Sequence, residues 1–191
     1  MPKLETPPTT SSPTDEAYTL IGSIYLSEQL DLLHLAVINL LDMVTDQEID
    51  LVLEQENKDD RQKKLFIEKL LQSIRCLPLQ KLFQDHLEKN DLHFFQERNF
   101  GPFLNALHHA ANQCTVVKLT VAIEFKEKDV RDLAVLLSKK IGQQVVLNLK
   151  VDKSMIGGAI VQHGSYLNDY SLKTQLDMYR SRWHHAVAEN Q

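Results

Sequence analysis

The sequence has no excess of basic residues and few cysteines. It contains 21 Lys and Arg against 26 Asp and Glu, which gives a net charge of −5. This balance leaves no broad basic surface to neutralise phosphates, so nucleic acid and anionic lipid are poor partners. The two cysteines, Cys76 and Cys114, have no C-x-x-C spacing and lie in apolar helical contexts. We expect buried thiols in a reducing compartment rather than a disulfide.

Long apolar runs are also absent. The longest, residues 32–44, carries polar side chains and is too short to cross a bilayer, so we expect no membrane insertion. Residues 1–15 hold four of the six prolines and no apolar block. A disordered tail is therefore predicted there, without the apolar core of a secretory signal or the arginines of a transit peptide.

No familiar catalytic or metal-binding pattern occurs in the chain. The sequence lacks G-x-S-x-G, H-E-x-x-H, both glycine-rich phosphate loops and any Cys/His constellation. The histidine pairs His108–His109 and His184–His185 are adjacent, and neighbours on a helix point about 100° apart, so neither pair forms the i, i+4 site of a zinc helix. We expect no catalytic residue, no cofactor and no metal, and binding is the better hypothesis.

Glycine is missing between Ser23 and Phe100, and helices are expected over this region. Apolar residues at helical spacing predict several of them, over residues 30–44, 61–76, 79–90 and 106–114. Pro78 is expected to end the second, and a capping box at residues 45–48 to start one more. The helix over 30–44 is apolar around most of its circumference, so it either sits centrally in a bundle or lines a groove that a partner covers.

From Thr115 onward the apolar period changes to that of strands. Alternation predicts strands over residues 117–125, 145–151, 155–162 and 165–167, with helices over residues 127–141 and from 171 onward. Gly142 is the expected end of the first of these helices. The predicted fold class is therefore α+β: an antiparallel helical bundle over residues 16–114, followed by a small β-α-β-β-β-α domain over residues 115–191.

Three of the six glycines, Gly157, Gly158 and Gly164, fall within eight residues. The first two lie in the apolar segment IGGAIV, where glycine usually marks a bulge or a close approach of backbone, and Gly164 suits a hairpin turn. Ser171 is the expected N-cap of the last helix, and the Asp169 carboxylate suits its positive end. These residues are interpreted as shaping the backbone rather than holding a phosphate.

The same segment carries a wider pattern, D-K-S-x-x-G-G, then a turn glycine, then D-x-S and a helix with spaced leucines. Its residues are Asp152, Ser154, Gly157, Gly158, Gly164, Asp169, Ser171 and Leu176. This pattern resembles the C-terminal signature of the delta subunit of F-type ATP synthases, called the oligomycin sensitivity-conferring protein in mitochondria. Upstream, residues 87–95 (LEKNDLHFF) are similar to the family's E-N-G-R-L segment, with Asn90 at the glycine position. Gly101-Pro102 falls where the family has a continuous helix.

The resemblance implies a non-catalytic stator subunit rather than an enzyme. It implies that the helical domain grips the N-terminal helices of the alpha subunits, and that the C-terminal domain holds the C-terminal end of the stalk's b subunit. Rotation would thereby be coupled to ATP synthesis and ion transport. It also implies a peripheral position at the cytoplasmic face of the bacterial inner membrane and no homo-oligomer.

Candidate contact residues are apolar and aromatic side chains of both domains. For the alpha-subunit interface we predict Tyr18, Leu20, Ile24 and Tyr25 in the first helix, with Phe94 and Phe95, and an ordinary core role is the alternative for all six. For the stalk interface we predict Met178, Tyr179, Arg182 and Trp183. Two other functions stay open: a free-standing regulatory adaptor that binds a peptide or small ligand through the α+β domain, and a small enzyme with Asp152 or Asp169 as a base, which lacks a paired group.

Overall fold

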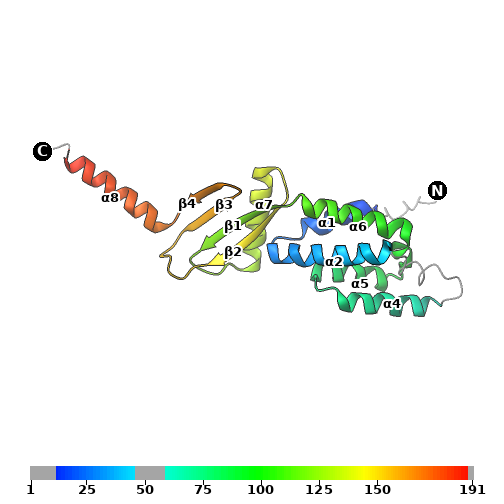
Figure 1. Ribbon diagram of the computed structural model, residues 1–191. Coiled ribbons are helices and arrows are strands. Elements are labelled where there is room, and N and C mark those ends of the chain that lie inside the picture. Colours follow the sequence, from blue (N-terminus) through cyan, green and yellow to red (C-terminus); the bar gives the residue numbers. More distant parts are fainter. Residues whose placement is uncertain (1–11, 46–58, 189–191) are drawn as a thin grey trace, which may run out of the picture. The chain divides into compact units, whose positions relative to one another are not determined.

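The computed structural model describes residues 12–45 and 59–188, with side chains described as far as residue 181 (Figure 1). The chain forms two compact units. Unit 1 comprises Met1–Ile24 and Asp31–Gln113, and unit 2 comprises Tyr25–Leu30 and Cys114–Gln191. The segment Tyr25–Leu30, which we placed in the helical domain, packs with unit 2. The predicted capping box at residues 45–48 extends outside the described residues.

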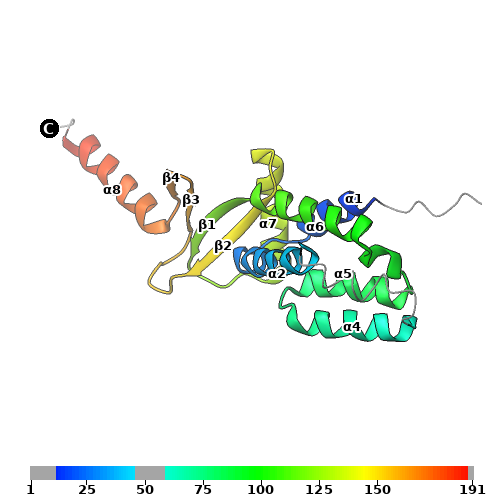
Figure 2. The ribbon, with the colours of Figure 1, turned by 45° about the vertical axis from the view of Figure 1, so that its right-hand side comes forward.

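The structure confirms the α+β class, with a helical first part and a small sheet in the second. Its first part contains α1 (Pro13–Gly22), α2 (Ser27–Thr45), α4 (Asp60–Ser73), α5 (Leu77–Glu88), the 3-10 helix η1 (Leu92–Phe95) and α6 (Glu97–Asn112). α4 and α5 lie side by side in both views (Figures 1 and 2).

α1 begins earlier than predicted. The Ser12 hydroxyl accepts a hydrogen bond from the Asp15 amide at 3.1 Å, and the Asp15 carboxylate accepts one from the Ser12 amide at 3.3 Å. This reciprocal pair is a capping box. Residues 12–15, predicted as the end of a disordered tail, instead start a helix; residues 1–11 lie outside the described part.

Pro78 and Pro102, the two prolines between residues 16 and 114, lie inside helices. Pro78 lies in the first turn of α5 rather than ending the preceding helix, because an N–H is not needed there. α4 ends at Ser73, three residues before the predicted end at Cys76. Pro102 lies within α6, which begins at Glu97 instead of residue 106 and continues through the proline.

Five phenylalanines form the centre of the unit 1 core. The ring of Phe83 lies 5.3–6.2 Å, centroid to centroid, from four other rings, those of Phe94, Phe95, Phe100 and Phe103. All five side chains are buried. Asn90, just after α5, adopts φ 58°, and this left-handed residue turns the chain into η1. The turn therefore brings Phe94 and Phe95 back onto Phe83.

Unit 2 has the predicted order β-α-β-β-β-α. The elements are β1 (Thr115–Val121), α7 (Glu127–Ile141), β2 (Val145–Val151), β3 (Ala159–His163), β4 (Tyr166–Asp169) and α8 (Leu172–Ala188). The sheet order is β2-β1-β3-β4, with β1 parallel to β2 and antiparallel to β3. α7 covers one face of the sheet (Figure 2), and its Val130 and Ala134 pack on Val117, Val145 and Leu147.

Several boundaries of unit 2 differ from the predicted ones. β1 ends at Val121 rather than Phe125, and Ile123 is exposed. Gly142, at φ 79°, ends α7 as predicted. Leu26 pairs in parallel with Leu147, whose amide donates to the Tyr25 carbonyl at 2.7 Å. This single bridge ties the segment to the β2 edge and explains why residues 25–30 belong to unit 2.

Candidate partner-binding surfaces

α8 exposes the large apolar side chains of its described part, which ends at Ser181. Leu172, Leu176 and Tyr179 follow the 4, 3 spacing that places them along one stripe of a helix, and they are 43%, 60% and 67% exposed. Met178 is exposed too, but lies off this stripe. Arg182 and Trp183 belong to the helix, while their side chains lie outside the described part. Among the predicted stalk residues, Tyr179 is therefore the one that the described side chains place on the stripe.

Two basic residues border this stripe along one side. Lys173 and Arg180 are exposed and lie beside Leu172, Leu176 and Tyr179 on the helical wheel. Long cationic side chains can extend along an apolar surface while their charges stay in water. The stripe therefore suits a partner helix with an apolar seam and acidic residues along one side of it.

The clustered glycines permit a close approach of two backbone segments, as predicted. Gly157 and Gly158 precede β3, which begins at Ala159 and not at the predicted residue 155. A Cβ on Gly158 would lie 2.3 Å from the carbonyl oxygen of Tyr170, and the residue has φ 86°. Gly164, at φ 57°, forms the turn between β3 and β4.

Asp152 and Asp169 serve their own turns. The Asp152 carboxylate accepts from the Ser154 hydroxyl and amide at 2.6 and 2.9 Å, and these bonds lower its pKa, the hydroxyl more. For Asp169, the Thr174 hydroxyl at 2.7 Å lowers the pKa most, followed by the Ser171 amide at 2.8 Å. A lowered pKa makes a carboxylate a weaker base, which disfavours the enzyme alternative.

The six residues predicted for the alpha-subunit interface do not share one exposed face. The side chains of Leu20, Ile24, Phe94 and Phe95 are buried. Ile24 and Tyr25 follow α1, which ends at Gly22, so they are not in the first helix as predicted. Tyr25 packs against the core of unit 2. Tyr18 is 50% exposed and is the one member of the set with an exposed side chain, while Tyr25 is half-buried.

α2 exposes large apolar side chains that were not among the predicted interface residues. Its Leu33 and Val37 are buried, whereas Leu35 and Ile38 are 58% and 46% exposed. The buried side agrees with the first interpretation of this helix, a place inside the bundle, whereas Leu35 and Ile38 lie on the arc of the helical wheel that also carries Asp31 and Asp42. The charged side chains of α2 are all acidic: Glu28, Asp31 and Asp42.

His86 fastens α1 to the rest of unit 1. Its Nε2 lies 2.9 Å from Glu16 Oε2 and its Nδ1 lies 3.0 Å from Asp91 Oδ2. The ring also stacks on Phe94, with centroids 3.9 Å apart. Both ring nitrogens therefore face carboxylate oxygens, which accept hydrogen bonds. His86 is therefore a structural link, with its polar atoms satisfied although the residue is buried.

Two further histidines, His34 on α2 and His108 on α6, lie against each other. The rings of His34 and His108 meet edge to face at 6.5 Å, and His34 Nε2 and His108 Nδ1 are buried without a hydrogen-bond partner. Two imidazoles alone do not supply the ligand set of a structural metal. No group of three potential ligands occurs within the described residues.

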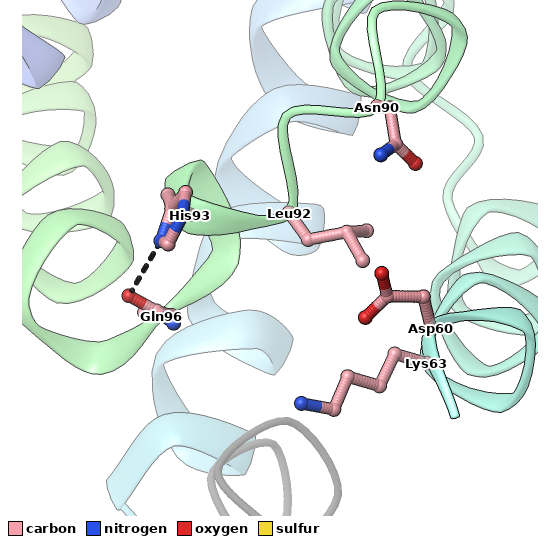
Figure 3. Close-up of a pocket in the computed structure, with 6 residues that line it drawn as sticks. All are labelled: Asp60, Lys63, Asn90, Leu92, His93 and Gln96. Atoms are coloured by element: carbon pink, nitrogen blue, oxygen red, sulfur yellow. Dashed lines mark hydrogen bonds between the residues drawn. The ribbon is translucent and has the colours of Figure 1, made fainter. Parts of the chain in front are cut away.

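Figure 3 shows a small polar cavity of about 200 Å³ in unit 1. It is lined by Asp60, Lys63, Asn90, Leu92, His93 and Gln96. His93 Nδ1 lies 3.3 Å from Gln96 Oε1, within hydrogen-bond distance. Asp60 and Lys63 bring charges of opposite sign to the lining. Ligand pockets are typically larger and mostly apolar, so this cavity supports no particular ligand.

The thiols are not activated for chemistry. Burial raises the pKa of the Cys114 thiol to about 11 and also raises that of Cys76. Cys76 is buried as predicted, and Cys114 is half-buried. A thiol with a raised pKa is mostly protonated and is a poor nucleophile.

Within the described residues, no helix is both long and apolar enough to cross a bilayer.

Comparison with known proteins gives consistent results. The family model of the ATP synthase delta (OSCP) subunit matches residues 27–182. ATP synthase subunit delta of Desulforamulus reducens is 30% identical over 137 residues, covering 66% of this chain and 76% of that protein. The sodium ion specific ATP synthase subunit delta of Ilyobacter tartaricus is 33% identical over 116 residues, covering 61% of this chain and 65% of that protein.

Among solved structures, a chain of the cryo-EM structure of the Toxoplasma gondii mitochondrial ATP synthase hexamer matches at 13% identity and a TM-score of 0.35. It covers 90% of this chain and 94% of that one.

Proposed function

The chain belongs to the ATP synthase delta (OSCP) subunit family, and from this membership we propose that it is a non-catalytic stator subunit. Unit 1 binds the N-terminal helices of the alpha subunits at the top of the catalytic head. Unit 2 binds the C-terminal end of the peripheral stalk's b subunit. The subunit thereby keeps the head from turning with the rotor, so that rotation is coupled to ATP synthesis and ion transport.

The observation that carries this proposal is the exposed apolar stripe of α8. A helix that packs on its own domain buries such side chains, yet Leu176 and Tyr179 are mostly in water and Leu172 is partly exposed. Burying an apolar surface stabilises a complex by about 25 cal/mol per Å² removed from water, before the costs of association. An amphipathic partner helix that packs along this stripe would bury these side chains together with its own apolar side chains, and this burial would stabilise the complex.

The head-binding surface of unit 1 is the less defined of the two. Of the predicted residues, Tyr18 on α1 is exposed. The exposed side of α2, where Leu35 and Ile38 lie among acidic residues, is a further candidate. Attachment at two ends raises the effective affinity by a factor on the order of 10² or more when both partners belong to one assembly. Such a linker can tie head to stalk although each contact alone is of ordinary strength.

The proposal also gives the subunit its place. As a peripheral part of the complex, it would lie at the cytoplasmic face of the bacterial inner membrane and enter the complex through protein contacts. We propose binding to alpha and b subunits, with no homo-oligomer, nucleic acid or cofactor.

A binding experiment with the full chain tests this function. A fragment from the C-terminal end of the b subunit and a peptide of the first 20 or so alpha-subunit residues should each be retained by the immobilised protein. Leu176→Ala should weaken capture of the b fragment, whereas Ser181→Ala, on the opposite side of α8, should leave it unchanged. If neither the fragment nor the peptide is retained, the stator assignment is wrong.

A further inference from the structure

The segment that joins the sheet of unit 2 to α8 is held by backbone bonds. The Tyr170 amide donates to the Ala159 carbonyl at 2.8 Å, and the Leu172 amide donates to the Gly157 carbonyl at 3.0 Å. Gly158 lies between these two bonds, and a Cβ there would overlap both Tyr170 O and Ser171 Cα, at 2.3 and 2.8 Å. The first residue of α8 is therefore clamped onto the glycine pair.

Side chains from β4 and α8 add a second set of contacts at the same place. Asp169 Oδ1 accepts from the Ser171 amide at 2.8 Å, and Asp169 Oδ2 accepts from the Thr174 hydroxyl at 2.7 Å. The Ser171 hydroxyl accepts from the Thr174 amide at 3.3 Å and caps the helix. Ser171 is buried, which is unusual for a serine.

From Leu172 to Ser181, where its side chains are described, the rest of α8 has no comparable hold. Between Leu172 and Ser181 every side chain is exposed except Thr174, which is half-buried. In both views α8 meets the rest of unit 2 at its N-terminal end alone (Figures 1 and 2). The direction in which the helix leaves the sheet is therefore determined by a few residues at that end.

We propose that Gly157, Gly158 and the Asp169–Ser171–Thr174 cap form a rigid joint that fixes the direction of α8 for its partner. The proposal rests on the stator function, because a fixed direction matters where the helix receives a stalk. A helix already held in its bound orientation loses less freedom on binding and so binds more tightly. The joint residues therefore act as positioning residues without touching the partner.

Two glycines of unit 2 provide a matched comparison. Gly142 and Gly158 both have positive φ, 79° and 86°, but a Cβ at Gly142 would have nothing within 4 Å. Gly142→Ala therefore carries the backbone strain of a positive φ, whereas Gly158→Ala adds the overlap with Tyr170. Any effect of Gly158→Ala beyond that of Gly142→Ala therefore measures the contribution of the close contact with Tyr170.

The direction of α8 can be measured on the full chain without a partner. Nitroxide labels at Asn148→Cys and Arg180→Cys, both exposed, are placed in a background with Cys76→Ala and Cys114→Ala, and their separation is read by pulsed electron resonance. The wild-type joint and Gly142→Ala should give one narrow distance distribution, and Gly158→Ala a broad or shifted one. A broad distribution in the wild type, or an unchanged one in Gly158→Ala, overturns the proposal.

A milder variant covers the case in which Gly158→Ala does not fold. Asp169→Asn weakens the cap without adding volume, and it should broaden the same distribution. An unchanged distribution in folded Asp169→Asn would count against the joint in the same way.

Binding then separates the joint from the stator function. Gly158→Ala should bind the b-subunit fragment at least tenfold more weakly than Gly142→Ala. Leu176→Ala should weaken binding while leaving the distance distribution narrow. If the wild type binds no fragment but shows the narrow distribution and Gly158→Ala the broad one, the joint stands and the proposed function fails. Equal binding by Gly158→Ala and Gly142→Ala would show that direction is not what the partner needs.

Discussion

α1 and α8 start in the same way and end up in opposite environments. Each begins with a serine, Ser12 before α1 and Ser171 before α8, whose hydroxyl accepts a hydrogen bond from a backbone amide of the first turn. In both, an aspartate takes part in the same cap. α1 then buries Ala17, Leu20 and Ile21 in unit 1. α8 leaves its leucines and Tyr179 exposed.

The difference shows that capping and apolar spacing determine where a helix forms but not what covers it. Both helices present an apolar side, and in both the cap satisfies amides that the helix leaves unpaired. What separates them is the neighbour: α1 packs against α6 and is tied by Glu16 to His86, while α8 is held at one end. An uncovered apolar side on a well-capped helix is the feature expected of a surface that awaits a partner.

The same substitution in both helices should break this comparison most strongly. Leu20→Ala removes a side chain that is 7% exposed and should lower the free energy of unfolding by about 2–5 kcal/mol, because a cavity remains. Leu176→Ala changes an exposed side chain and should stay within about 0.5 kcal/mol. Denaturant unfolding of both variants measures the contrast, and similar losses would show that α8 packs on its own unit.

The tie between Glu16 and His86 gives the next largest effect. Glu16→Gln replaces a carboxylate that faces His86 at 2.9 Å by a neutral amide, and should cost about 1–3 kcal/mol of unfolding free energy. Glu68→Gln, an exposed position within α4, is the matched control and should be nearly neutral. In a double-mutant cycle with His86→Gln, the two losses should not add; additive losses would mean that the pair is not coupled.

Much of unit 2 was predictable from the sequence because its patterns are local. Alternation located β1 and β2, Gly142 marked the end of α7, and Ser171 marked the start of α8. The pattern of the glycine pair predicts a close approach of backbone, but the strand predicted over residues 155–162 includes the pair, whereas β3 begins after it. The partner backbone at Tyr170 and Ser171 comes from a later part of the chain, and local spacing does not reveal where it lies.

Unit 1 was less predictable because its contacts are distant in sequence. Pro78 and Pro102 suggested breaks, yet one lies in a first turn and the other inside a helix whose buried residues hold it in place. Choosing interface residues by aromatic character selected Phe94 and Phe95, which join the ring cluster around Phe83 instead. Exposure, which separates a core aromatic from a contact residue, depends on packing that the sequence pattern does not show.

The two caps provide a finer test of the comparison. Ser12→Ala and Ser171→Ala each remove a hydroxyl that accepts an amide, a change that costs about 1 kcal/mol at a typical N-cap. For Ser12→Ala the loss should appear in the global unfolding of unit 1, because α1 is part of its core. For Ser171→Ala it should appear as faster amide exchange at the start of α8, with little change in global unfolding. A purely global loss in Ser171→Ala would mean that α8 is as integral to its unit as α1.

The smallest expected effect is the response of the α8 cap to acid. The Thr174 hydroxyl, followed by the Ser171 amide and hydroxyl, lowers the pKa of Asp169 below that of an unfolded chain. A carboxylate of this kind contributes stability above its unfolded pKa and loses it as the pH falls through the lowered folded pKa. The amides of Ser171 and Thr174 should therefore shift together in an NMR titration at acidic pH, and the start of α8 should fray. Asp169→Asn should abolish this response while the Ser154 amide still follows Asp152, which has its own lowered pKa outside the joint. If the amides of α8 titrate unchanged in Asp169→Asn, the cap is not what holds the helix start, and the likeness between the two helix beginnings is one of sequence alone.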